Sequence, residues 1–110
     1  MTYAKTEIFT QELQEIALIS KALSHPARLA IVQFLANQKT CISGDISNHI
    51  PLSRTTVSQH LQELKKAGLI KGTIDGLKIN YCLDRDKLLE IKQQFDYFFK
   101  NATNSIDFKC

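Results

Sequence analysis

The polar run SRTTVSQH, from Ser53 to His60, holds the side chains with the clearest chemical use. A Gln side chain can pair bidentately with adenine, Arg can pair with guanine, and a Thr methyl can meet the thymine methyl. Short hydroxyls can hold phosphate oxygens. Together these residue types could read bases and hold the backbone of a DNA duplex. The candidate residues are Ser53, Arg54, Thr55, Thr56, Ser58, Gln59 and His60.

These side chains need a helix that turns one face to solvent, and the sequence predicts one over Ser53–Ala67. Ser53 is a plausible N-cap and Gly68 a plausible C-terminal stop. At about 100° per residue, Thr55 and Gln59 lie outermost. The side chains of Thr56, Ser58 and His60 lie on the flanks, where His60 could donate equally well to a phosphate or to a backbone carbonyl. The buried face is defined by three residues at helical spacing: Val57, Leu61 and Leu64.

A second, shorter helix is predicted just before this one. Ser43 could cap it, Ile46 and Ile50 lie one turn apart, and Pro51 ends it. Two short helices joined by a tight turn form a helix-turn-helix, whose second helix can enter the DNA major groove. Any capped surface helix shows a polar face, however. The pattern therefore also fits a protein–protein interaction module with no DNA role.

A β-hairpin is predicted from Leu69 to Cys82. Asp75-Gly76 is a strong signal for a two-residue turn, which would pair Ile74 with Leu77, Lys71 with Asn80 and Ile70 with Tyr81. One face would then be apolar. The other face would be polar and could lie along the DNA backbone beside the helix, as a wing. The wing candidates are Lys71, Thr73, Lys78 and Asn80.

The positive charge of the chain is concentrated in this same region. The whole chain of 110 residues has a net charge of +3, and residues 53–82 alone, with five cations and two acids, also carry +3. A local basic surface indicates a polyanionic partner. An excess of this size also occurs on surfaces that bind nothing, so the charge alone does not decide the function.

Helices are also predicted over Glu7–Leu23, Pro26–Gln38 and Asp84–Asn101, with a short strand at Thr40–Ile42. The fold class is therefore mainly α with a small β-hairpin (α+β), in the order α-α-β-α-α-β-β-α. The apolar stripes of the first and last helices are wider than a monomer needs, which favours a homodimer. The expected dimer interface contains Phe9, Leu13, Ile16, Leu88, Ile91, Phe95, Phe98 and Phe99.

Three stretches together resemble the ArsR-type winged helix-turn-helix transcriptional regulators: KALSHPARLAIVQFL, TTVSQHLQELKKAGLI and IDGLKINYCL. The resemblance covers Lys21 to Leu83. It implies a cytoplasmic homodimer that binds a double-stranded DNA operator, represses transcription and releases DNA when an inducer binds. It places Thr55 to His60 in the recognition helix and Lys71 to Asn80 in the wing. We expect residues 1–110 to form one such domain, with dimerisation helices at both ends.

The chain departs from this family at the sensor. Metal-sensing members often carry Cys-x-Cys-Asp at the start of the third helix, whereas this chain reads CISGD from Cys41 to Asp45, with one cysteine. Others use carboxylates and histidines of the last helix, which here has no histidine. Because thiolate and imidazole are the ligands that select zinc-like metals, we expect no metal and no cofactor, and the inducer stays unknown.

Three widely spaced cysteines do not predict a disulfide framework. We expect Cys41 to be a buried small hydrophobic residue, with thiol sensing or metal ligation as alternatives. Cys82 shares the polar hairpin face, where a nearby lysine could favour its thiolate. His25 is expected to cap a helix or to pack. No phosphate-binding glycine loop and no catalytic set stands out, so we expect no enzyme. The acidic N-terminus and the lack of a membrane-length apolar run indicate the cytoplasm.

Overall fold

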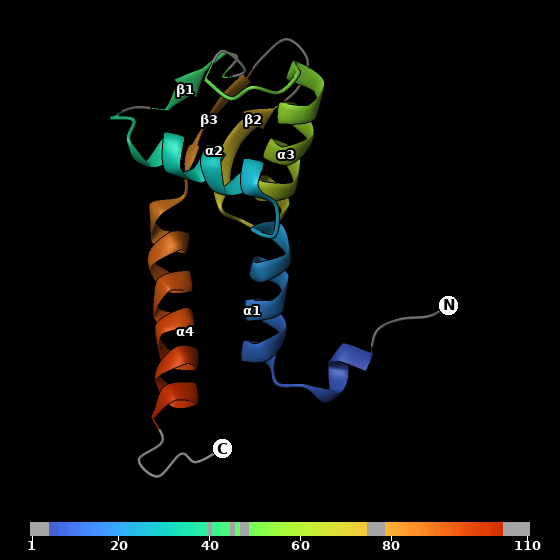
Figure 1. Cartoon of the computed structure of the whole chain (residues 1–110), viewed down its shortest axis with the longest axis vertical. Coiled ribbons are helices and arrows are strands. Elements are labelled where there is room, and N and C mark those ends of the chain that lie inside the picture. Colours follow the sequence, from blue (N-terminus) through green and yellow to red (C-terminus); the bar gives the residue numbers. More distant parts are fainter. Residues whose placement is uncertain (1–4, 40, 45, 47–48, 75–78, 105–110) are drawn as a thin grey trace.

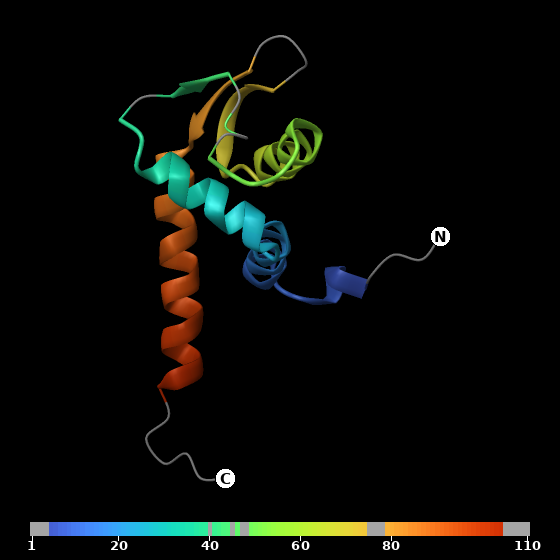
Figure 2. The same ribbon diagram turned by 45° about the horizontal axis from the view of Figure 1, so that its top comes forward.

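A computed structural model describes residues 5–39, 41–44, 46, 49–74 and 79–104 of the chain. Figure 1 shows two helices that run away from a head made of a small sheet and two further helices. Figure 2 shows the first of these two helices almost end-on and the last one extending away from the head. Among the described residues, no helix combines the length and the apolar composition needed to cross a membrane. In chain order the elements are η1 Lys5–Ile8, α1 Gln11–Ala22, α2 Pro26–Ala36, β1 Ile42–Ser43, α3 Arg54–Lys66, β2 Ile70–Ile74, β3 Ile79–Leu83 and α4 Arg85–Thr103.

Each α-helix is preceded by a capping residue. The side chain of that residue accepts a hydrogen bond from a backbone amide in the first turn of the helix. The Thr10 hydroxyl accepts from the Leu13 amide, so α1 starts at Gln11 and not at the predicted Glu7, and residues 5–8 form a separate 3-10 turn. His25 caps α2, as predicted, because its Nδ1 accepts from the Ala27 amide at 3.0 Å. The side chains of Ser53 and Asp84 cap α3 and α4 in the same way.

The short helix predicted between Ser43 and Pro51 falls largely on residues 45, 47 and 48, which lie outside the described part of the chain. Among its described residues, the His49 amide donates to the Ile46 carbonyl at 2.8 Å, which is a turn. Ser43, its predicted cap, lies in β1 instead. Ile46 and Ile50 are 2% and 5% exposed, so both anchor this connection to the core.

The three strands form an antiparallel sheet in the order β1-β3-β2. The predicted hairpin register is wrong by two positions: Ile70 pairs with Leu83 and Ile74 with Ile79. The predicted two-residue turn, Asp75-Gly76, lies outside the described residues. The observed register extends the ladder to the buried Leu83 and lets Tyr81 pair with Ile42 of β1. This longer pairing favours the observed register over the predicted one.

The two faces of the hairpin are as predicted, because a slip of two residues keeps each side chain on its face. Ile70 and Tyr81 are buried, and Lys71, Thr73 and Asn80 are exposed. At Gly72, paired with Tyr81, the strands approach so closely that a β-carbon would overlap the Asn80 carbonyl. Its φ of +123° also favours glycine.

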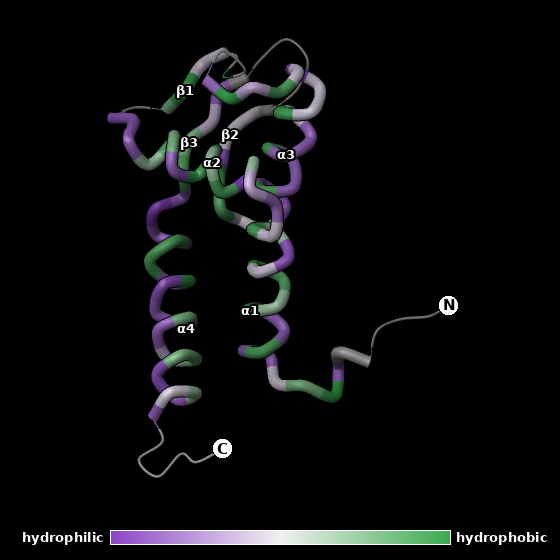
Figure 3. The backbone as a smooth tube through the Cα atoms, viewed as in Figure 1, coloured by the Kyte–Doolittle hydropathy of each residue, from purple (hydrophilic) through white to green (hydrophobic). Residues whose placement is uncertain are grey.

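The hydrophobic core lies in the head and continues to the near end of the two long helices. It combines α2, α3 and the inner face of the sheet with the adjoining parts of α1 and α4. Its most deeply buried large side chains are Tyr81, Ile31, Ile46, Leu64 and Leu69. Hydrophobic and hydrophilic residues alternate along α1 and α4, and neither helix is wholly apolar (Figure 3).

Candidate nucleic-acid interface

The helix α3 presents the predicted polar face to solvent. Val57, Leu61 and Leu64 are at most 2% exposed, which confirms the predicted inner face. On the other side, Thr55 and Gln59 are exposed, as is Arg54. The core therefore fixes the rotation of this helix and leaves the amide of Gln59 and the hydroxyl of Thr55 accessible.

The first turn of α3 is held by its own hydroxyls. The Ser53 Oγ accepts from the Thr56 amide at 3.2 Å and donates to the Thr56 Oγ1 at 2.9 Å. Ser53 is exposed, whereas Thr56 and Ser58 are half-buried. A capped helix N-terminus with nearby hydroxyls is a site that favours phosphate oxygens.

His60 does not lie on the exposed surface, so its place among the predicted DNA-contacting residues needs correction, and the two expected roles, donating to a phosphate or to a backbone carbonyl, give way to an accepting one. It is 8% exposed. Its Nδ1 accepts from the Arg28 Nε at 3.0 Å, and its ring lies 4.4 Å from the His25 ring, centre to centre. Arg28 also donates to the Ala22 carbonyl at 3.3 Å. His60 therefore positions α3 against α2, a role that only the packing of the two helices could reveal.

The pKa of His60 is lowered from 6.5, first by burial and then by the positive charge of His25 and Arg28. Below pH 6.5 the unfolded chain consequently binds more protons at this residue than the folded protein does. The stabilisation is complete above that pH and is lost as the pH falls through the lowered pKa. We expect the free energy of unfolding to fall as the pH drops below about 6.5, and to fall less steeply in His60→Gln.

Urea denaturation at stepped pH measures this dependence. His49→Gln is the matched control, because His49 is exposed and should leave the pH dependence of the parent unchanged. Any substitution can change the free energy of unfolding itself. The quantity to compare between variants is therefore the slope of that free energy against pH. Equal slopes in the parent and in His60→Gln would contradict the assignment.

The polar face of the hairpin carries the predicted wing residues that the structure describes. Lys71, Thr73 and Asn80 are all exposed, and Thr73 pairs with Asn80 across the strands. Lys78 lies outside the described residues. The strand β2 follows α3 after a short connection through Gly68, so the polar faces of α3 and of the hairpin belong to adjoining elements (Figure 1).

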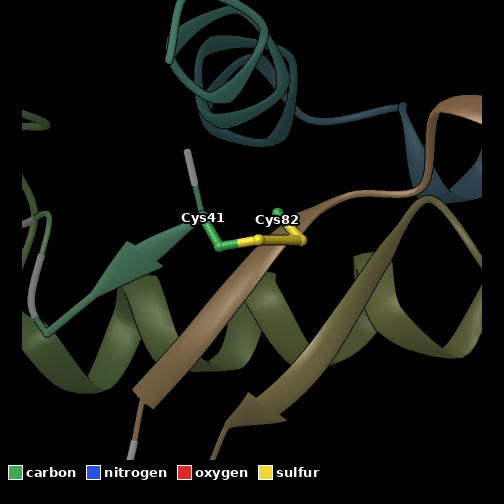
Figure 4. Close-up of a disulfide and its surroundings, with 2 residues drawn as sticks. All are labelled: Cys41 and Cys82. Atoms are coloured by element: carbon green, nitrogen blue, oxygen red, sulfur yellow. A yellow bond between two sulfur atoms is a disulfide. The ribbon is translucent and has the colours of Figure 1, made fainter. Parts of the chain in front are cut away.

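Cys41 and Cys82 form a disulfide, which the sequence did not predict (Figure 4). Cys41 is exposed, so its expected role as a buried hydrophobic residue is wrong. The pairing of Ile42 with Tyr81 places Cys41 beside Cys82, the next position along β3. The only signal that could have found this bond is the pairing of β1 with β3, which no local pattern in the sequence indicates.

The helices α1 and α4 lie beside each other, and the Gln94 Nε2 donates to the Glu15 Oε2 at 2.6 Å. A hollow of about 650 Å³ lies between the helices, lined by side chains that include Leu13, Ile16 and Phe98. The exposed large hydrophobic residues of this part of the chain are Ile8, Phe9, Leu13, Leu18, Leu89, Tyr97, Phe98 and Phe99.

The predicted interface residues therefore divide into two groups. Ile91 is 6% exposed and belongs to the core, and Leu88 and Phe95 pack against that core. The sequence pattern could not separate these residues from the outer ones, because they share one stripe of α4. Ile8 and Tyr97, which are 75% and 68% exposed, are further exposed apolar residues that the predicted set does not contain.

The model of the family described as "Bacterial regulatory protein, arsR family" matches residues 25–71. This match begins at the cap of α2 and ends in β2, so it contains all of α3. It therefore covers the segment in which the polar helix face was found.

Two curated relatives are similar over a larger part of the chain. The cadmium resistance transcriptional regulatory protein CadC homolog of Staphylococcus aureus is 30% identical over 83% of this chain and 75% of its own length. The HTH-type transcriptional regulator CmtR of Mycobacterium tuberculosis is 35% identical over 69% of this chain. The chain spans 65% of the length of CmtR.

A solved structure from Mycobacterium bovis has a similar fold. It is a homodimeric winged helix-turn-helix DNA-binding domain, and it aligns with a TM-score of 0.58 over 99% of this chain and 98% of its own. The two sequences are 20% identical. This likeness confirms the predicted winged helix-turn-helix fold.

Proposed function

Because the chain belongs to the ArsR family of bacterial regulatory proteins, we propose that it is a cytoplasmic, homodimeric repressor that binds a DNA operator. Residues 1–110 would act as one DNA-binding domain with dimerisation helices at both ends. The observation that carries the proposal is the exposed polar face of α3, fixed by the core beside the polar face of the hairpin.

In this proposal α3 enters the major groove, which admits one α-helix. Gln59, Thr55 and Arg54 are exposed on α3 and have the side chains that read base edges. Ser53, Thr56 and Ser58 lie at or near the helix N-terminus, where hydroxyls and amides hold phosphate and fix the register of the helix on DNA. His60 is omitted, because it is buried against Arg28.

The wing lies along the DNA backbone flanking the groove. Lys71, Thr73 and Asn80 are exposed on one face of the hairpin, and Lys78 belongs to the same set on sequence grounds. These residues add charge and hydrogen bonds without selecting bases. They therefore raise affinity for any duplex, whereas α3 supplies discrimination.

A second copy of the chain covers the exposed apolar residues of α1 and α4. Leu13 is 43% exposed, Phe98 39% and Phe99 56%, which is costly for a monomer in water. A two-fold dimer presents two copies of α3 and binds a pseudo-palindromic site, with half-sites about one helical turn, or a multiple of it, apart.

The staphylococcal relative is named for cadmium resistance, but we do not propose cadmium as an inducer of this protein. Cys41, which stands where metal-sensing relatives carry their cysteines, is bonded to Cys82. In the part of the chain that the structure describes, no three His, Cys, Asp or Glu side chains gather as metal ligands do. We therefore assign no metal as the inducer.

Lys71→Ala is expected to weaken binding to specific and random duplexes alike. Removing one phosphate contact should reduce the slope of log affinity against log salt by about 1. Fluorescence anisotropy with a labelled duplex at stepped salt measures both quantities. Lys100→Ala is the matched control, because this exposed lysine lies near the far end of α4, away from the head.

The same titration tests the function itself. The parent protein should bind random duplex weakly, with an affinity that falls steeply as salt rises. A protein–protein interaction module would show no DNA affinity and no such dependence. That result would overturn the proposal.

A further inference from the structure

We propose that Cys41 and Cys82 form a reversible redox site and that their oxidation to the disulfide strengthens DNA binding. The inference rests on the proposed DNA-binding function. A DNA-binding protein works in the cytoplasm, where reducing systems make stable structural disulfides rare. A disulfide in a protein of that compartment is usually catalytic or redox-sensing.

The bond lies where small reagents can reach it. Cys41 is exposed and Cys82 half-buried, and their Cα atoms are 4.5 Å apart. Cys82 projects from the outer face of the sheet, the face that also carries Lys71 and Asn80. Figure 4 shows the bond between the start of β1 and the strand β3. Oxidant and reductant therefore need no opening of the core.

The bond holds an otherwise weakly attached element. The strand β1 has two residues, Ile42 and Ser43, which pair with Tyr81 and Asn80 of β3. The next nine residues of the chain lead directly to Ser53, the cap of α3. The cysteines are 41 positions apart and enclose both α3 and β2 in one covalent loop. Oxidation therefore fixes the entrance of the recognition helix against the wing and reduces the ordering cost of binding DNA.

Lys71 provides a second reason why oxidation should strengthen DNA binding. It pairs with Cys82 in the sheet, so both side chains lie on the same face at directly opposite positions. In the reduced protein, a thiolate at Cys82 would place a negative charge opposite the Lys71 ammonium and partly neutralise it. In the disulfide the sulfur is uncharged, and Lys71 keeps its full charge for a phosphate.

The oxidation balances with a peroxide as the oxidant. The Cys82 thiolate attacks the peroxide, the O–O bond breaks, and a sulfenic acid forms while hydroxide or alkoxide leaves and takes up a proton. The Cys41 thiol then attacks this sulfur, the S–S bond forms, and water leaves. The cysteines lose two electrons in total. Two equivalents of a thiol such as glutathione return them and become a disulfide themselves.

The test uses the full chain with Cys110→Ser, so that only the pair can react, alongside the unaltered protein. Each protein is equilibrated in glutathione buffers of stepped ratio, and the free thiols are counted by alkylation and mass spectrometry. Anisotropy then measures the affinity of both states for one duplex. Amide hydrogen exchange of Ile42 and Ser43 reports on β1 without DNA. Cys41→Ser and Cys82→Ser provide forms that cannot be oxidised to this disulfide.

We expect the pair to titrate reversibly, and the oxidised form to bind DNA on the order of 5-fold more tightly or better. In neither serine variant should peroxide produce the increase in DNA affinity that it produces in the parent, because neither can form this disulfide. Exchange at Ile42 and Ser43 should be slower in the oxidised form. A bond that resists excess glutathione, or equal affinity in both states, would overturn the proposal.

Failure of the underlying function is distinguishable from failure of the switch. If no state binds any duplex, the DNA-binding function fails, and with it the claimed effect on affinity. The reversible titration and the exchange at β1 still decide whether the pair is a redox site. If the exchange rates are equal in both states, the structural basis of the switch is wrong.

Discussion

A Phe98→Glu variant is expected to be monomeric and to bind a two-half-site operator about 100- to 10,000-fold more weakly than the parent. Phe98 is 39% exposed and lines the hollow between α1 and α4, beside Leu13. A carboxylate there would be buried without a partner in the proposed dimer, which is costly. Loss of the dimer removes the second recognition helix from the complex, and with it the gain from binding two half-sites at once.

The matched control is Leu89→Glu. Leu89 is 60% exposed on the same helix, and it precedes Phe98 by nine positions, which at about 100° per residue puts it on the opposite side. Light scattering should show a dimer for the control and a monomer for Phe98→Glu. Both variants should bind a single half-site as the parent does, which checks that the head is intact. A dimeric Phe98→Glu with full operator affinity would contradict the proposed interface.

Gln59→Ala is expected to lower the discrimination between operator and random duplex by on the order of 1–3 kcal/mol, a factor of about 5 to 150. Gln59 is exposed on α3, two positions after the buried Val57, so the core aims its side chain outward. A glutamine amide can make two hydrogen bonds with adenine, and alanine can make neither. Binding to random duplex relies on phosphate contacts and should change little.

Anisotropy with both duplexes at one fixed salt concentration measures this ratio. Gln93→Ala on α4 is the control, because it removes the same exposed amide from a helix outside the head. The control should keep the discrimination of the parent. If Gln59→Ala loses as much affinity for random duplex as for the operator, Gln59 does not read a base.

The sequence predicted the recognition helix well because its signals are local. A capping serine, three apolar residues at helical spacing and a terminating glycine lie within sixteen consecutive residues. In the structure the helix spans Arg54–Lys66, with Ser53 and Ala67 as its two caps, and its buried face is the predicted one. The faces of the hairpin were also predictable, since alternation with a period of two survives an even change of register.

The features that the sequence missed all depend on contacts between distant segments. His60 is buried because Arg28, 32 positions away, covers it. The hairpin register follows the burial of Leu83 and the pairing of β3 with β1. The disulfide links positions 41 residues apart. No local pattern carries such information, and a stripe of apolar residues does not show which of them face the core.

We propose that two copies of α3 read two DNA half-sites, and selection of bound duplexes from a random DNA library distinguishes this arrangement from others. We expect enrichment of a pseudo-palindrome whose half-sites are centred about 10–10.5 base pairs apart, or a multiple of that spacing. No enrichment, or enrichment of one unrepeated element, would contradict it.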